Sequence, residues 1–325
     1  MTKEMDKKDW KILYQLCQNS RMSHNSIAKL VGASKNSVTY RVNRLLSRGI
    51  ISGFFTIVDI APLGAVFYTL LLKLNATKER EKEFLDYLKP NDKVSVIDGF
   101  VGEWNFLVEF CCKNPYTFFE FLADLKGKFS DIVEDYEVHQ TLEIYKVEQL
   151  PVELVRETTS GFQAKTKPGS VKLDRTEIKL LSELNKNSTA PLLELADKIG
   201  VTYKTVSAKI KELKESGIII KFTANISLES LGYDVYLILL DLRNLSIKRE
   251  SDLKAYINSQ KNIRSAFISA AKPTVFIYIA VKSSLELQHF LVETKRGFRD
   301  IIVNQNYLLS SDQIKCELFP DGILE

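Results

Sequence analysis

The apolar residues at the start of the chain follow a helical period three times in succession. Asp6 is a good N-terminal cap for the first period, Gly32 ends the second, and Ser34 and Gly49 stand at the two ends of the third. The residues expected to face a common core are Ile12, Leu13, Leu16, Ile27, Ala28, Val31, Val38, Val42, Leu45 and Leu46. The next stretch, "IISGFFTIV", is rich in β-branched and aromatic residues, which favour a strand or a hairpin wing. The pattern therefore predicts a winged helix-turn-helix.

The pattern changes after Leu63-Gly64. We expect a strand within 65–75, a helix over 77–88, two strands within 93–112, a helix over 115–129 and a strand over 132–147. This β-α-β-β-α-β order is the ferredoxin-like arrangement, in which one face of a four-stranded antiparallel sheet carries no helix. Leu70 and Leu72 alternate with Leu71, so neither face is polar. We expect the free face to pair with a second sheet, either within the chain or in another chain.

The whole pattern occurs twice, because the chain aligns with itself at a shift of 168 residues. Asp6 then meets Asp174, and the Gly-Ile-Ile at 49–51 meets the Gly-Ile-Ile at 217–219. A polar stretch broken by glycine and proline separates the halves and predicts a linker. The fold class is thus α+β, with two copies of a winged helix-turn-helix followed by a ferredoxin-like domain. The expected boundaries are 1–60 and 61–150 for the first copy, 151–172 for the linker, and 173–228 and 229–325 for the second copy.

The third helix of a winged helix-turn-helix enters the major groove of DNA, so double-stranded DNA is the expected partner. With a net charge of only +4, the chain depends on local clusters of basic and hydrogen-bonding side chains for such contacts. In the first copy the candidate DNA contacts are Ser34, Lys35, Asn36, Ser37, Thr39, Tyr40, Arg41, Arg44 and Arg48. In the second copy they are Thr202, Tyr203, Lys204, Thr205, Ser207, Lys209 and Lys211. Asn suits adenine, Arg suits guanine, and hydroxyl groups suit phosphate oxygens.

The two helices differ in charge. No acidic residue lies between Ser34 and Arg48, whereas the second helix also carries Glu212 and Glu215. Lysine is also a poorer bidentate reader of bases than arginine. We therefore expect the first copy to read sequence and the second to contribute mainly backbone contacts, which predicts an operator with one strong and one weak half-site.

Other chemistry finds little support in the residue pattern. The four cysteines, Cys17, Cys111, Cys112 and Cys316, lack metal-site spacing and are expected to be packing residues. The histidines His24, His139 and His289 lie far apart in the sequence, with no pattern of a triad. We expect no catalytic residues, no metal and no cofactor. No apolar stretch is long enough to cross a membrane, which favours a cytoplasmic protein.

The layout resembles the Lrp/AsnC (feast/famine) family of transcriptional regulators. The resemblance is carried by Met5-Asp6, Ile27-Ala28, Gly32, Ser34, Val38, Arg41, Leu45 and Gly49-Ile50-Ile51, and in the second copy by Leu173-Asp174, Leu195-Ala196, Gly200, Thr202, Val206, Leu213 and Gly217-Ile218-Ile219. Family members are usually single-copy and dimerise, so the tandem chain resembles a fused dimer. The resemblance implies a DNA-binding regulator whose ferredoxin-like domains mediate assembly, here as a dimer of pseudo-dimers, and can sense a small molecule.

The chain departs from the family at the turn between the second and third strands of the effector domain. The family's G-x-x-D turn there is associated with amino-acid binding, but this chain has "GEWN" at 102–105 and "AKPT" at 271–274. The candidate effector contacts are therefore Gly102, Trp104, Asn105, Lys272 and Thr274. An amino-acid effector is disfavoured, and another ligand or none is left open.

An enzyme is the alternative interpretation, because siroheme decarboxylases use the same fold, including fused two-copy forms. Such an enzyme should bind a polycarboxylate macrocycle with His and Arg side chains. None of the three histidines lies in the strand pair where those enzymes share a His-Cys-Tyr run.

Overall fold

The computed structural model describes residues 5–151 and 169–324 and contains two copies of the same element order. The first copy comprises α1 (Lys7–Gln18), α2 (His24–Val31), α3 (Lys35–Ser47), β1 (Ile51–Val58), η1 (Ala61–Leu63), β2 (Val66–Leu74), α4 (Lys78–Leu88), β3 (Val94–Val101), β4 (Phe106–Cys112), α5 (Pro115–Phe129) and β5 (Val133–Val147). The second copy comprises α6 (Arg175–Lys186), α7 (Leu192–Ile199), α8 (Tyr203–Glu215), β6 (Ile219–Ile226), η3 (Glu229–Leu231), β7 (Asp234–Leu242), α9 (Ile247–Ser259), β8 (Ile263–Ser269), β9 (Val275–Val281), α10 (Ser284–Gly297), β10 (Ile302–Cys316) and η4 (Asp321–Leu324). The predicted α+β fold class is confirmed.

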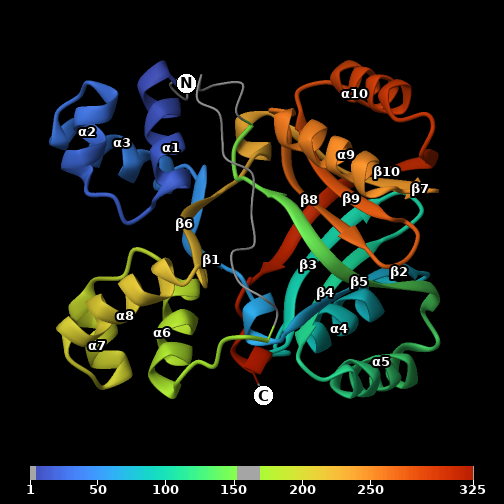
Figure 1. Ribbon diagram of the computed structural model, residues 1–325, viewed down its shortest axis with the longest axis horizontal. Coiled ribbons are helices and arrows are strands. Elements are labelled where there is room, and N and C mark those ends of the chain that lie inside the picture. The colour runs from blue at the N-terminus through green and yellow to red at the C-terminus, as the bar shows by residue number, and fades with distance from the viewer. Residues whose placement is uncertain (1–4, 152–168, 325) are drawn as a thin grey trace.

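The two ferredoxin-like sheets join at their edges into one closed eight-stranded barrel (Figure 1). The strand order is β10-β3-β4-β2-β5-β8-β9-β7, and β7 closes the ring by pairing with β10. The long strands β5 and β10 make the joints, because each pairs with a strand of its own copy at one end and with a strand of the other copy at the opposite end. Of the two pairings that the sequence left open, within the chain or with another chain, the structure shows the one within the chain, and it uses strand edges as well as faces.

Barrel closure explains why both faces of the strands are apolar. Leu71, Leu107, Leu237 and Phe276 fill the barrel interior. Leu70 and its neighbours on the outer face pack under α4 and α5, and the second copy repeats this arrangement with α9 and α10. The short strands β3, β4, β8 and β9 therefore bury both faces along most of their length, whereas the long strands β5 and β10 are mostly half-buried or exposed.

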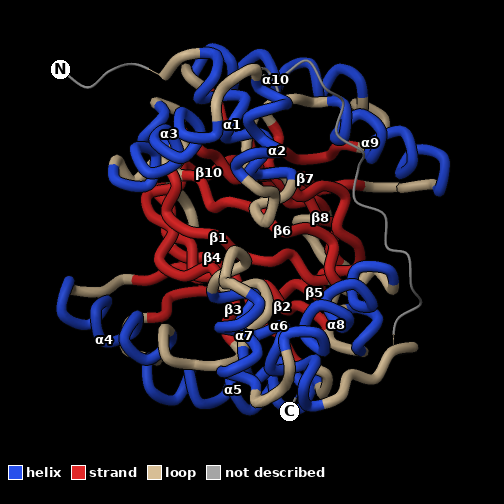
Figure 2. Tube along the Cα trace, turned by 90° about the vertical axis from the view of Figure 1, so that its left-hand side faces the viewer, coloured by secondary structure: helices blue, strands red, loops and turns tan. Residues whose placement is uncertain are grey.

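The two helix-turn-helix units lie together on one side of the barrel, with a two-stranded sheet of β1 and β6 between them (Figure 2). In this view α3 and α8 lie diagonally opposite each other about the centre, as a pseudo-twofold axis would arrange them. The hydroxyl groups of Ser20 and Ser188, which occupy equivalent positions in the two copies, are buried and 2.6 Å apart. The hydrogen bond between them therefore lies on the pseudo-twofold axis.

Each helix-turn-helix unit packs against the other copy. The core of the first unit includes Ile226, Leu228 and Val235 of the second copy, and the core of the second unit includes Val58 and Leu63 of the first. Two hydrogen bonds also join each unit to the other copy. The Thr223 hydroxyl of β6 donates to the Cys17 carbonyl at the end of α1, and the Thr56 hydroxyl of β1 donates to the Leu184 carbonyl of α6. The run predicted as a strand or hairpin wing is thus a single strand, β1, paired with the other copy.

Most local expectations agree with the structure. Asp6, Ser23 and Ser34 cap α1, α2 and α3 through their side chains. Three of the four cysteines are buried among apolar residues, and Cys316 is half-buried. The expected linker lies largely outside the described residues. In the described parts of the chain, no helix has the length and apolar character needed to cross a membrane.

Candidate nucleic-acid interface

The N-terminal half of α3 is an exposed surface rich in hydrogen-bonding groups. Ser34 caps the helix by accepting a 3.2 Å hydrogen bond from the Ser37 amide. Lys35, Asn36 and Tyr40 are exposed, and Tyr40 keeps 67% of its surface accessible although it is a large aromatic residue. An exposed helix N-terminus with donors around it suits phosphate oxygens and base edges.

Arg41 and Arg44, also predicted to contact DNA, instead point toward α1. The Arg41 guanidinium lies 2.8 Å from the Asp6 carboxylate and 2.7 Å from that of Asp9, and Arg44 lies 2.6 Å from Asp9. Asp9 is fully buried and also accepts a hydrogen bond from the Asp6 amide in a capping box. The amide of Asp9, together with Arg41, lowers the pKa of Asp6 to about 2. The two arginines thus fasten α3 to the start of α1.

The second copy repeats one of these contacts. Lys209 of α8 occupies the position of Arg41 and pairs with Asp174 at 2.7 Å and with Glu177 at 3.4 Å. These acids are the N-cap residue and the third residue of α6, as Asp6 and Asp9 are in α1. Glu212 takes the position of Arg44, so the second network is smaller. In the first copy the sequence signal of the contact between α1 and α3 is an acidic pair, Asp6 and Asp9, together with a basic pair, Arg41 and Arg44. The members of each pair are three residues apart.

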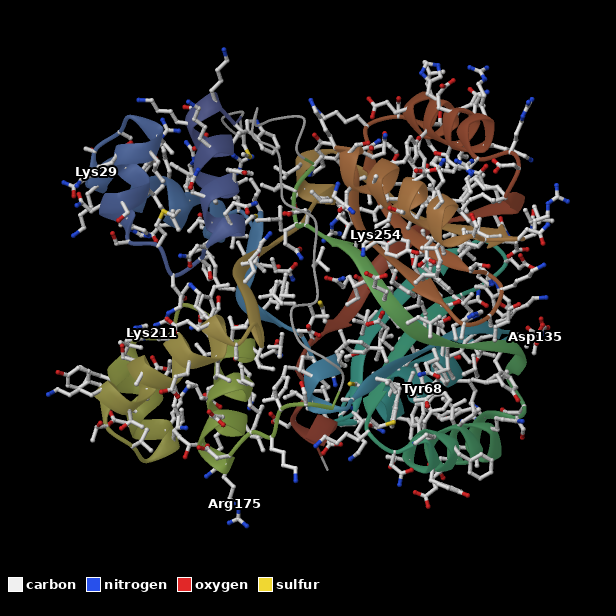
Figure 3. The ribbon with its side chains drawn as sticks, viewed as in Figure 1. Lys29, Tyr68, Asp135, Arg175, Lys211 and Lys254 are labelled. Carbon is white, nitrogen blue, oxygen red and sulfur yellow. The ribbon has the colours of Figure 1, made fainter. Side chains whose placement is uncertain are left out.

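The other predicted contacts divide by exposure. Thr39 is half-buried, donates to the Lys35 carbonyl and is hydrogen-bonded to His24. Arg48 is a half-buried C-cap of α3. In the second copy Thr202 caps α8, Thr205 is half-buried beside it, and the exposed candidates are Tyr203, Lys204, Ser207 and Lys211. Lys29 of α2, which was not among the candidates, projects from the outer side of the first unit (Figure 3).

The predicted effector residues lie in two equivalent turns. The Asn105 side chain accepts a hydrogen bond from the Leu74 amide, and the Thr274 hydroxyl accepts one from the Leu242 amide. Trp104 is buried in the barrel core, whereas Gly102 and Lys272 are exposed. Asn105 and Thr274 thus stabilise the ends of β2 and β7, and an effector at these turns stays a prediction.

The comparisons with known proteins agree with this geometry. A family model described as "Winged helix-turn-helix DNA-binding" matches residues 5–52 and 173–220. The HTH-type transcriptional regulator FL11 of Pyrococcus furiosus is 30% identical over 138 residues, which cover 40% of this chain and 89% of that protein. The leucine-responsive regulatory protein of Rhizobium meliloti is 24% identical over 126 residues, covering 38% of this chain and 80% of that protein. The chain belongs to the Lrp/AsnC family of transcriptional regulators.

Solved structures of the siroheme decarboxylase NirDL resemble this Lrp/AsnC protein over both copies. The siroheme decarboxylase NirDL superimposes with a TM-score of 0.63 at 15% identity, covering 98% of this chain and 96% of that one. At this identity the likeness concerns the fold alone. It indicates that the fold of the whole chain, with both copies, also occurs in that protein.

The structure also brings together charged residues that the sequence pattern did not single out. Asp98, Glu109 and Arg264 line a cavity between the barrel and the sheet of β1 and β6. Asp98 and Glu109 come from the consecutive strands β3 and β4, whereas Arg264 comes from β8 of the other copy, more than 150 residues along the chain. No local pattern therefore points to them as a group.

Proposed function

We propose that this chain is a DNA-binding transcriptional regulator that presents both recognition helices of a dimer from a single polypeptide. The observation that carries the proposal is the joining of the two helix-turn-helix units on one side of the barrel, through the sheet of β1 and β6 and the Ser20–Ser188 hydrogen bond. A fixed separation of recognition helices lets two units bind two half-sites on one face of DNA.

The side chains proposed to contact DNA are the exposed ones near the start of each helix. Lys35 and Lys204 would bind phosphates, and Asn36 would read a base edge, with adenine as the favoured partner. The exposed Tyr40, Tyr203 and Ser207 and the half-buried Ser37 complete the surface. Arg41 and Lys209 would act mainly by holding the recognition helices, because both are engaged with carboxylates of the preceding helix.

The expected inequality of the two half-sites therefore has a new basis. At equivalent positions the first copy has Asn36 and Tyr40, and the second has Lys204 and Ala208. Asn is a base reader, whereas Lys mainly binds phosphate as a point charge. We propose that the first half-site carries more of the sequence specificity.

Binding to DNA fragments selected from a random pool, followed over a range of salt concentrations, tests this function. Lys35→Ala and Lys204→Ala should each weaken binding to all sequences and reduce the salt slope by about 1, whereas Asn36→Ala should relax specificity at one position of the site. Arg175→Ala is the matched control, because this exposed side chain points away from both recognition helices (Figure 3). A salt slope near zero for the unmodified protein would refute the proposal.

An enzyme of the siroheme decarboxylase type is the second candidate, supported by the full-length likeness to NirDL. The charged cavity of this chain measures about 150 Å³, a size that holds a single benzene-sized ring, whereas a tetrapyrrole contains four pyrrole rings. None of the described residues that line the cavity is a histidine. We therefore expect siroheme not to enter this cavity, and absorbance and decarboxylation assays with added siroheme test the second candidate.

Location and assembly complete the proposal. We propose that the protein acts in the cytoplasm, where it has access to DNA, and that it self-associates further. All eight described barrel strands have two neighbours, so a second chain would have to bind an outer surface and not a free strand edge. Sedimentation of the full chain with and without DNA tests this self-association.

A further inference from the structure

A partly open cavity lies between the end of the barrel and the sheet of β1 and β6. It measures about 150 Å³, and its walls come from both copies and from both wing strands. Phe55 of β1, Ile220 of β6, Phe67 of β2 and Phe267 of β8 provide apolar surface. The cavity thus borders the DNA-binding part of the molecule and the barrel at once.

Charged and polar groups from several strands line or adjoin this apolar space. By strand they are Asp98 (β3), Glu109 (β4), Lys146 (β5) with Glu148 and Gln149 just beyond it, Lys221 (β6), Arg264 (β8), Tyr278 (β9), and Gln313 and Cys316 (β10). Buried charges are costly unless they are paired, so the partner of each group matters.

Most of these groups are matched inside the protein. Lys221 pairs with Glu148 at 2.9 Å, and Lys146 donates to the Gln260 carbonyl at the end of α9. Asp98 accepts a 2.8 Å hydrogen bond from Tyr278, which joins the two copies across the barrel. These groups therefore need no ligand.

Two groups are not fully matched. The Glu109 carbonyl accepts a hydrogen bond from the Ser95 hydroxyl, but its carboxyl group has no hydrogen-bond donor among the described residues, and the acid nearest to it is Asp98, a group of the same charge. Arg264 donates to Gln149 at 3.1 Å, but its buried Nε atom has no partner among the described residues. Burial, with Asp98 nearby, raises the pKa of Glu109 to about 8. A ligand in the cavity would therefore have to place a hydrogen-bond donor beside the unmatched carboxyl group of Glu109.

The duplication shows that this arrangement is not required by the fold. At a shift of 169 residues, Glu109 corresponds to Tyr278 and Asp98 to Phe267. The equivalent positions of the second copy thus carry a phenol and an aromatic ring, which need no counter-charge. The acids occur in one half only, so a barrel of this kind can close without them.

We propose that this cavity binds a small organic cation whose protonated nitrogen donates to Glu109 and whose apolar body packs against Phe67 and Phe267. The volume fits a ligand of about one aromatic ring, since an apolar cavity of about this size holds benzene. The carboxyl group selects a donor with positive charge, and the aromatic side chains add cation–π attraction. Arg264 disfavours a second positive charge on the ligand.

A ligand in the cavity would contact strands that are connected to a recognition helix. The walls of the cavity include β1 and β6, and Thr223 of β6 is hydrogen-bonded to the end of α1, whose start holds Arg41 of α3. The cation would therefore change DNA affinity, a consequence that rests on the proposed DNA-binding function, whereas binding of the cation itself does not.

Three isosteric probes, the benzamidinium cation, neutral benzamide and the benzoate anion, test the site by calorimetry on the full chain without DNA. n-Butylammonium is added as a cation of different shape. We expect the cations to bind and the other two probes to bind at least tenfold more weakly. In two buffers of different ionisation enthalpy at pH 7, cation binding should release up to one proton, because it ionises Glu109.

Glu109→Gln, which keeps the size of the side chain, should weaken cation binding at least tenfold and abolish the proton release, while Glu120→Gln on the exposed face of α5 should change neither. Equal binding of benzamide, preference for benzoate, unchanged binding to Glu109→Gln, or no binding of either cation would each overturn the proposal. A DNA titration with and without benzamidinium then tests the coupling. If the chain binds no DNA in this titration, either with or without benzamidinium, the result counts against the proposed DNA-binding function and not against the cation site.

Discussion

Replacing Arg41 with methionine separates a structural role from a DNA-reading role. Methionine keeps much of the aliphatic stem and removes the guanidinium that touches Asp6 and Asp9. If Arg41 fastens α3 to α1, the first helix-turn-helix unit loses stability before any DNA is present. If Arg41 reads bases, stability stays the same and sequence-specific affinity is lost.

The burial of the two carboxylates that Arg41 touches sets the size of the stability loss expected for Arg41→Met. Asp9 is 0% exposed, and removing one partner of a buried ion pair costs about 3–5 kcal/mol. Arg44 remains 2.6 Å from Asp9 and offsets part of this, while Asp6 is 48% exposed and contributes little. We expect a loss of about 2–3 kcal/mol for Arg41→Met. Lys209→Met should cost about 1 kcal/mol or less, because its nearer partner Asp174 is 55% exposed.

Hydrogen exchange of peptides from α1 and α3 measures this stability locally, with peptides from α6 and α8 as the internal reference. A loss of about 2 kcal/mol corresponds to about 30-fold faster exchange through local opening. Lys35→Ala is the matched control, since this exposed residue should affect DNA affinity and leave exchange unchanged. Unaltered exchange in Arg41→Met together with a loss of specific DNA affinity would refute the structural role.

Three further predictions concern the barrel and the pseudo-twofold axis. Burial raises the pKa of Glu109 from 4.5 to about 8, so between these pH values the folded chain binds one proton more than the unfolded chain. The free energy of unfolding should therefore fall as the pH rises through this range, by at most about 1.4 kcal/mol per pH unit. In urea titrations at several pH values, Glu109→Gln should reduce this dependence of the unfolding free energy on pH. Gly102→Ala should cost about 1–3 kcal/mol in the same assay, because φ is 148° and the new Cβ would lie 2.7 Å from Leu308 Cδ2; an unchanged midpoint would contradict the strain. Ser20→Ala leaves the buried Ser188 hydroxyl without its partner and should cost about 1–2 kcal/mol, whereas the double variant with Ser188→Ala should recover part of the loss; strictly additive losses would argue against the bond.

Local elements were predictable because their signals are local. The caps Asp6 and Ser34 and the apolar periods behind them define α1 and α3, and the structure begins each of these helices directly after its cap. The duplication, read from aligned residues, correctly indicated two equivalent halves. The exposed positions of α3 were only partly predictable, since helical spacing puts Arg41 on the polar face and says nothing about the carboxylates of α1 that engage it.

By itself, the sequence determined the kinds of elements, their order and their repetition, because propensity, capping and periodicity act between residues a few positions apart. Only the tertiary structure decided which strand edges meet, which copy each helix-turn-helix unit packs on, and that Glu109 and Arg264 share a cavity. Those choices depend on burial summed over contacts between distant segments. Free strand edges and apolar faces can be satisfied by any partner of the right shape, and closing the barrel within one chain satisfies all of them at once.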